Sequence, residues 1–220
     1  ITTRLVGSEM CKETAINLPN TITEIKANAF QYCRALASIS IPNSVISIGD
    51  YAFSDCSALT SIRIPESVTT IGAGIVTGCT NLTEIQVEAG NPAYSAVDNI
   101  LYDKEQTTLI QCLPSKTSVS LPATVTVIGS SAFNNCTGLT SITLPQSLTT
   151  IGDRAFWNCT SLTSIDIPRS VSAIGESAFF NSGLTSISIP EAVTNIGNST
   201  FSNCGYLASV TCLLYTSDAA

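Results

Sequence analysis

A phrase of 23 residues repeats along almost the whole chain, and this repetition constrains the fold more than any other feature. Its consensus is Ile/Leu-Pro-x-x-Val-x-x-Ile-Gly-x-x-Ala-Phe-x-x-Cys-x-x-Leu-x-x-Ile-x. The units begin at Leu18, Ile41, Ile64, Leu121, Leu144, Ile167 and Ile189. Successive starts are 23, 23, 57, 23, 23 and 22 residues apart, and the interval of 57 holds one ordinary unit and one enlarged unit of 34 residues. The pattern predicts about eight stacked coils, with part of another before Leu18.

Each unit is interpreted as one coil of a solenoid. Leu59, Ile62 and Ile64 follow a Leu-x-x-Leu-x-Leu pattern, which indicates a short strand with its apolar side chains in the core. Because side chains alternate across a strand, Ser61 should point outward. The glycine of each unit, such as Gly72, suits a turn with positive φ. The Ala-Phe-x-x-Cys segment predicts about one helical turn. One coil cannot bury its apolar side alone, so neighbouring coils must complete the core.

The phrase LTSIxIPxSVTxIGxxAFxxC is typical of the BspA-like leucine-rich repeat family, which this chain resembles over about residues 14–211. The segments 59–79 and 139–159 match it nearly throughout. Repeats and resemblance together predict an α/β solenoid over residues 1–211, a right-handed leucine-rich repeat array with a parallel sheet on its concave face and short helical turns on its convex face. Two units depart from the pattern: the third has Gly74-Ile75-Val76 around the Ala-Phe position, and the seventh is one residue short, with Ser182 near the cysteine position.

The enlarged unit spans residues 87–120 and predicts a β-hairpin. Two apolar segments, 100–102 and 108–110, flank the polar loop 103–107. The acidic residues Asp98, Asp103 and Glu105 raise the alternative of a calcium site. Their spacing matches no EF-hand loop, so we expect solvated turn residues.

The sequence repeat ends after Val210-Thr211, where Cys212-Leu213 stands in place of the Ile-Pro of the motif. The string CLLYTSDAA, residues 212–220, resembles the conceptual translation of a transposase adapter used in sequencing libraries. We therefore expect a tail that is not native, on a fragment assembled from environmental reads. The alternative is a divergent natural terminus.

Composition argues against several functional classes. The chain has nine cysteines and no histidine, so the commonest general base and the commonest neutral metal ligand are missing. The net charge of −7 disfavours a nucleic-acid partner, and no apolar run approaches the roughly 18 to 20 residues of a membrane span. We expect neither an enzyme nor a cofactor, although carboxylate, lysine or all-cysteine chemistry remains formally open.

Six cysteines share one phase of the repeat and predict an inward row of buried, reduced thiols: Cys33, Cys56, Cys79, Cys136, Cys159 and Cys204. Parallel side chains on stacked coils make disulfides awkward, and no Cys-x-x-Cys pair offers a zinc site. Two further cysteines, Cys11 and Cys112, lie off this phase, and their state is open.

The outward positions of the predicted strands form a candidate binding face on the concave side. One column contains Ser38, Ser61, Glu84, Ser118, Ser141, Ser164 and Ser186. Its neighbour contains Ser40, Arg63, Gln86, Ser120, Thr143, Asp166 and Ser188. This face is small, polar and nearly free of aromatic anchors. It is either a broad contact surface of low affinity, summed over repeats, or ordinary solvated sheet polarity.

The predicted function is a non-enzymatic module that binds proteins. The family resemblance implies a cell-surface or secreted adhesin with host extracellular matrix partners such as fibronectin and fibrinogen. The alternative is an intracellular scaffold or regulatory repeat protein, for which many reduced thiols are more natural. A hydrolase would need a catalytic domain outside this chain.

Overall fold

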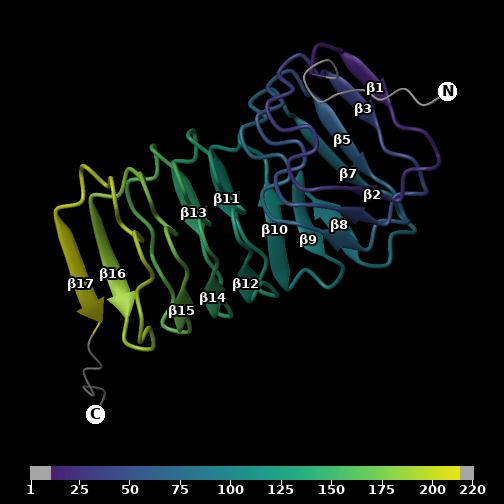
Figure 1. The fold of residues 1–220 in the computed structure, drawn as a ribbon. Helices are drawn as coiled ribbons and strands as arrows, with labels where there is room; N and C mark the ends of the chain where they lie inside the picture. Colours follow the sequence, from purple (N-terminus) through teal and green to yellow (C-terminus); the bar gives the residue numbers. More distant parts are fainter. Residues whose placement is uncertain (1–10, 214–220) are drawn as a thin grey trace.

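The repeat units stack because each places its short strands beside the same positions of the next unit. The computed structural model describes residues 11–213, which form a β-solenoid of about nine turns (Figure 1). The strands pair in parallel at the repeat spacing: Ile16 pairs with Ile39, and Ile62 pairs with Ile85. The predicted solenoid is therefore confirmed.

The short strands form two rows along the solenoid, and each ordinary turn contributes a strand to one or both rows. The first row contains β1 (Ala15–Asn17), β3 (Ser38–Ser40), β5 (Ser61–Ile64), β7 (Glu84–Val87), β11 (Ser118–Ser120), β13 (Ser141–Thr143), β16 (Ser186–Pro190) and β17 (Ser209–Leu213). It pairs as β1-β3, β5-β7, β11-β13 and β16-β17. The second row contains β2 (Glu24–Ile25), β4 (Ser47–Ile48), β6 (Thr70–Ile71), β12 (Val127–Ile128), β14 (Thr150–Ile151) and β15 (Ala173–Ile174).

The predicted helical turns are wrong, because the residues that the structure describes contain no helix. The Ala-Phe-x-x-Cys segments are turns with two left-handed residues four positions apart, such as Arg154 (φ 53°) and Asn158 (φ 59°). Left-handed residues interrupt the right-handed backbone that a helix needs. The Phe156 N–H donates instead to the carbonyl oxygen of Ala178 on the next coil, at 2.7 Å. Within residues 11–213, no helix has the length and apolarity needed to span a membrane.

The expectation of positive φ at the repeat glycines is also wrong. The described glycines with positive φ are Gly74 and Gly78, which replace ordinary residues at the two left-handed positions. The repeat glycines serve close contact between coils. A Cβ at Gly152 would lie 2.7 Å from the Ser130 backbone nitrogen, which is closer than side-chain atoms tolerate.

Phenylalanine rings stack along the turn side of the core, where the same position recurs on successive coils. The ring centroid of Phe156 lies 5.0 Å from that of Phe133 and 5.3 Å from that of Phe179, and the ring planes are nearly parallel. All three side chains are fully buried. Nearest-neighbour packing of this kind is the main source of cohesion in a solenoid.

The enlarged unit separates the core into two parts. It forms β8 (Tyr94–Val97), β9 (Ile100–Asp103) and β10 (Thr108–Cys112), which lie between the N-terminal and C-terminal coils (Figure 1). β9 and β10 pair antiparallel, so the predicted hairpin is confirmed, and β8 is a third strand that the sequence did not predict. Leu101 packs in the N-terminal core, whereas Ile100 and Tyr102 pack in the C-terminal core. Side-chain alternation thus buries both faces of this sheet.

Gly74, one of the departures in the third unit, is explained by a contact that crosses the enlarged unit. The Tyr51 side chain lies over Gly74, where a Cβ would be 2.6 Å from the tyrosine Cε1. The Tyr51 hydroxyl shares a hydrogen bond of 2.7 Å with the Ser131 hydroxyl, 80 residues along the chain. Because the enlarged unit has no Ala-Phe turn, Tyr51 joins the turn sides of the two halves, and only glycine leaves room for its ring.

The last described strand extends two residues past the expected domain boundary at residue 211. Cys212 and Leu213 belong to β17 and pair with Ile189 and Pro190 of β16. Residues 214–220 lie outside the described residues. The non-native origin of residues 212–220 stays a prediction.

We predict that Phe156→Ala destabilises the protein by about 3 to 5 kcal/mol, because the ring is fully buried and stacked on both sides. Hydrogen exchange should show faster opening confined to adjacent coils, since solenoid stability is a sum of neighbour contacts. Tyr206→Ala is the control: Tyr206 is 76% exposed, and its replacement should change stability by less than about 0.5 kcal/mol. Uniform loss of protection along the chain would contradict the prediction.

Candidate functional site

The two predicted columns lie together on the first row of strands, and we call these fourteen positions the serine-rich face. Apolar side chains such as Ile62 turn into the core between them, and all fourteen are exposed except Ser188, which is half-buried. Twelve stand on β3, β5, β7, β11, β13 and β16. Ser164 and Asp166 lie on residues 162–168, which form no strand.

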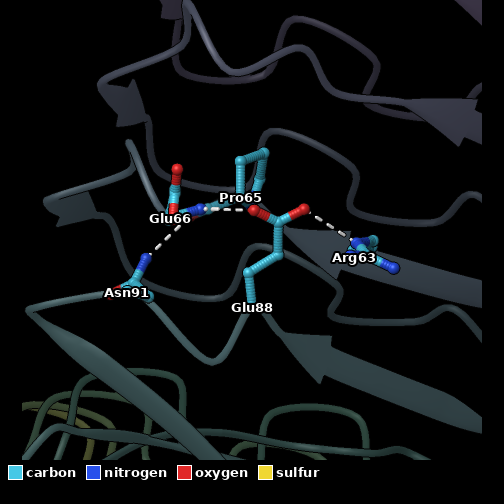
Figure 2. Close-up of polar contacts among 5 residues, drawn as sticks. All are labelled: Arg63, Pro65, Glu66, Glu88 and Asn91. Carbon is cyan, nitrogen blue, oxygen red and sulfur yellow. Dashed lines mark hydrogen bonds and ion pairs between the residues drawn. The ribbon is translucent and has the colours of Figure 1, made fainter.

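The charged groups in the N-terminal half of this face are already paired within the protein. The Arg63 Nε donates to the Glu88 carboxylate at 2.9 Å, and the Gln86 amide donates to Glu84 at 2.7 Å. Figure 2 shows Glu88 between Arg63 and the backbone N–H of Glu66, which donates at 3.0 Å. The Glu66 N–H and then Arg63 lower the pKa of Glu88 below its ordinary value.

These contacts hold the end of β5 against the start of the enlarged unit. The buried Asn91 amide donates to the carbonyl oxygen of Pro65 at 2.7 Å (Figure 2) and to that of Val68 at 2.9 Å. The polar groups around Glu88 therefore have a structural role.

A groove opens in the C-terminal half of the serine-rich face, around residues 162–168. Its volume is about 640 Å³, and β13 and β16 form its two sides. The polar residues along it are Thr143, Gln146, Ser164, Asp166, Arg169, Ser186 and Ser188. It is thus a part of the face that is hollowed enough to hold a side chain or a short segment of a partner, and a smaller hollow of about 320 Å³ lies around Arg63 and Gln86.

The in-phase cysteines are buried, free thiols as predicted at four of the six positions, Cys56, Cys79, Cys136 and Cys159. Their thiols also donate hydrogen bonds, which the sequence did not predict. Cys56 donates to the Phe30 carbonyl at 3.1 Å, and Cys159 donates to that of Phe133 at 3.2 Å. Burial raises the pKa of Cys56 to about 11, so the thiol stays neutral and unreactive at physiological pH.

Two of the six assignments are wrong. Cys33 forms a disulfide with Cys11, which lies 22 residues earlier, one residue off the 23-residue repeat. Cys204 is half-buried, because it lies on the last described turn and no further described turn covers it. The open case of Cys112 is settled: its thiol is buried, and it lies 3.6 Å from the Leu113 carbonyl oxygen that Cys136 approaches at 3.7 Å.

The acidic hairpin loop is held by its own hydrogen bonds. The Asp103 carboxylate accepts from the Thr107 N–H at 2.7 Å, the Thr107 hydroxyl at 2.5 Å and the Thr108 N–H at 3.0 Å. Burial alone would raise the pKa of Asp103, but these hydrogen bonds outweigh it and lower the pKa. Asp103 therefore stabilises the predicted turn, but it lies at the end of β9 and is half-buried rather than solvated. Over residues 11–213, no group of three or more Cys, Asp or Glu residues is placed to hold a metal ion.

An aromatic pair on the turn side was missed. Trp157 and Phe180 stack with centroids 4.0 Å apart, and the Arg154 guanidinium lies 5.7 Å from the centroid of Trp157. Both rings are half-buried. The position after the repeat phenylalanine holds Gln31, Ser54, Thr77 and Asn134 in other units. The signal was therefore present as two aromatic exceptions at a polar position.

The model of the BspA type leucine rich repeat region matches six copies in this chain, over residues 8–99 and 106–215. The chain belongs to this family. The resemblance to the BspA-like family that the repeat motif indicated is thereby confirmed. No curated protein matches the chain.

Solved structures similar to this BspA-type chain are bacterial leucine-rich repeat proteins. A leucine rich cell surface protein from Faecalibacterium prausnitzii is 30% identical, with a TM-score of 0.72, and the match covers 94% of this chain and 62% of that one. A leucine-rich repeat protein from Eubacterium ventriosum is 25% identical, with a TM-score of 0.62 and coverage of 90% and 72%.

The pneumococcal vaccine antigen PcpA shares the fold, at 24% identity and a TM-score of 0.75, with coverage of 93% of this chain and 57% of that one. This chain therefore spans less than two thirds of the length of both PcpA and the Faecalibacterium prausnitzii protein.

We predict that Cys56, Cys79, Cys136 and Cys159 resist alkylation in the native protein at pH 8, because burial keeps them neutral and inaccessible. Mass spectrometry after iodoacetamide treatment should show labelling of the exposed Cys212, and labelling of all four buried thiols only in denaturant. Since the pKa of Cys56 is raised in the fold, stability should fall as pH rises from about 8.5 toward 11. Fast labelling of the four in native protein would contradict the assignment.

We predict that Asp103→Asn destabilises the β9–β10 hairpin by about 1 to 2 kcal/mol, because charged acceptors make stronger hydrogen bonds than amides. The lowered pKa means that the ionised form stabilises the fold above about pH 4 and that this contribution is lost as pH falls further. Thermal melts from pH 7 to 3 should show a weaker pH dependence in the variant. Glu105→Gln, on an exposed residue of the same loop, is the control and should keep the wild-type profile.

Proposed function

We propose that this chain is a non-enzymatic, protein-binding module of a bacterial cell-surface or secreted protein. The observation that carries the proposal is the 30% identity, over 94% of this chain, to a protein described as a leucine rich cell surface protein. The similarity extends over both halves of the solenoid and the enlarged unit between them.

The disulfide between Cys11 and Cys33 supports a location outside the cytoplasm. Disulfides persist in oxidising compartments and are rare in the cytosol, where thiols are kept reduced. The remaining in-phase thiols up to Cys159 are buried, so an oxidising medium cannot easily reach them. This contrast favours the surface protein over the intracellular scaffold.

The serine-rich face is the proposed contact surface. It extends over successive coils, its hydroxyls are exposed, and its short side chains let a partner approach the strands closely. Such a face supplies many small contacts that sum over repeats, and it lacks the aromatic anchors of a concentrated hot spot. Host extracellular matrix proteins are the proposed partners, because BspA-like surface proteins act as adhesins.

The proposal includes no catalytic step. The chain has no histidine, and among residues 11–213 the acidic and thiol groups with resolved contacts are used in loops, ion pairs or the core. A binding role requires only the exposed surface that the stacked coils provide.

We predict that the protein binds immobilised fibronectin or fibrinogen and that Ser61→Arg with Ser118→Arg weakens this binding by about tenfold or more, because two long side chains would hold the partner off the face. Surface plasmon resonance would measure the change. Thr137→Arg, an exposed residue outside the face, is the matched control and should bind as wild type. Binding at background for the wild-type protein would exclude these partners, and equal losses in both variants would exclude the face.

A further inference from the structure

We infer that the groove at residues 162–168 is a subsite of the serine-rich face for an extended peptide segment that carries one basic and one acidic side chain two positions apart. The inference rests on the proposed function, since it specifies which part of the serine-rich face recognises the sequence of a protein partner. It adds a location, a backbone conformation and a charge pattern to that function.

The first observation is a break in the row of strands. β11 and β13 pair over three residues and β16 and β17 over five, but residues 162–168 between these pairs join neither β13 nor β16. β3 and β5, neighbours in the same row, also lack strand pairing with each other, yet both of those segments remain strands. From Ser164 to Ile167, the backbone makes no hydrogen bond to any described residue. Free N–H and C=O groups of this kind are the usual binding elements for an extended peptide.

The second observation is the size and lining of the groove. Its volume of about 640 Å³ lies within the range of roughly 300 to 1,000 Å³ that ligand sites usually have. Ile142, Ile165 and Ile187 also line the groove, but Ile165 and Ile187 are buried in the core, so the accessible side chains are mainly polar. A polar groove of this kind suits the backbone and the polar side chains of an extended peptide.

The third observation is the pair of charges. Asp166 and Arg169 are the charged residues that line the groove, both are exposed, and neither makes an ion pair or side-chain hydrogen bond with a described residue. Arg63 and Glu84, on the same face, are instead engaged by Glu88 and Gln86. A partner with one charge of each sign would complement the groove, whereas a partner with a single charge would leave one groove charge uncompensated.

The spacing follows from chain geometry. Asp166 and Arg169 are three positions apart, so their Cα atoms are separated by at most about 10 Å. Side chains on one face of an extended peptide recur every second residue, about 6.6 to 6.8 Å apart. Opposite charges at positions i and i+2 of an extended peptide therefore fit within that span.

The test uses two fluorescein-labelled probes, Thr-Val-Thr-Lys-Thr-Glu-Thr-Val and the same peptide with Lys and Glu exchanged, in fluorescence anisotropy titrations at low salt. At least one order should bind. Replacing its Lys by Gln should weaken binding to wild type about fivefold, the size of a good surface ion pair, and should have no effect on Asp166→Asn. Replacing its Glu by Gln should act in the same way through Arg169→Gln.

Arg34→Gln is the matched control, because it removes an exposed positive charge outside the serine-rich face, and it should leave peptide binding unchanged. Hydrogen exchange on each variant checks that the coils stay folded. The groove assignment would be overturned if peptide affinity stayed the same in the Asp166 and Arg169 variants and with the altered peptide charges. It would also be overturned if no peptide bound.

The two proposals can fail separately. If fibronectin or fibrinogen binds through Ser61 and Ser118 while the peptides show no charge dependence, the groove is wrong and the proposed function stands. If the peptides show the expected charge dependence and the matrix proteins do not bind, the groove stands and the proposed partners are wrong.

Discussion

Every coil of this protein depends on hydrogen bonds to its two neighbours, and the rest of the structure follows from that dependence. On the turn side the bonds run forward, as from the Phe156 N–H to Ala178. On the second row of strands they run backward, as from the Gly175 N–H to Ile151 at 2.8 Å. A coil thus satisfies its backbone only when both neighbours are in register. This requirement fixes the 23-residue spacing, stacks the phenylalanine rings and explains why glycine is needed where adjacent backbones meet.

The same dependence decides what the sequence could predict. Burial at Ile62 and exposure at Ser61 followed from strand alternation, and the hairpin around residues 103–107 followed from its local pattern. The turn side could not be predicted in this way. Ala-Phe-x-x-Cys is compatible with a helix, and nothing local indicates that Arg154 and Asn158 adopt positive φ. Bonds to the next coil stabilise that conformation against its intrinsic cost, so the outcome is tertiary.

The disulfide was missed for a related reason. Cys33 shares its repeat position with buried free thiols, and the phase alone predicts the same state for all of them. The difference lies in the preceding coil, where Cys11 provides a second thiol within bonding distance of Cys33. The repeat motif is incomplete around Cys11, so the consensus sequence could not predict the Cys11–Cys33 disulfide. Cys112 likewise lies off the phase in sequence but beside Cys136 in space, because the enlarged unit changes the path of the chain.

The strict repeat also indicates where function should be sought. A residue that recurs in every unit is explained by stacking, so specificity must come from positions at which one unit differs from the others. Asp166 is such an exception, in a column otherwise held mainly by serine, threonine and glutamine, and Arg169 is another, at the position that follows the repeat proline. Both stand on the one coil whose strand leaves the row. Changing a column residue leaves the backbone hydrogen bonds between coils intact, and the solenoid can therefore vary its exposed face one coil at a time without loss of the fold.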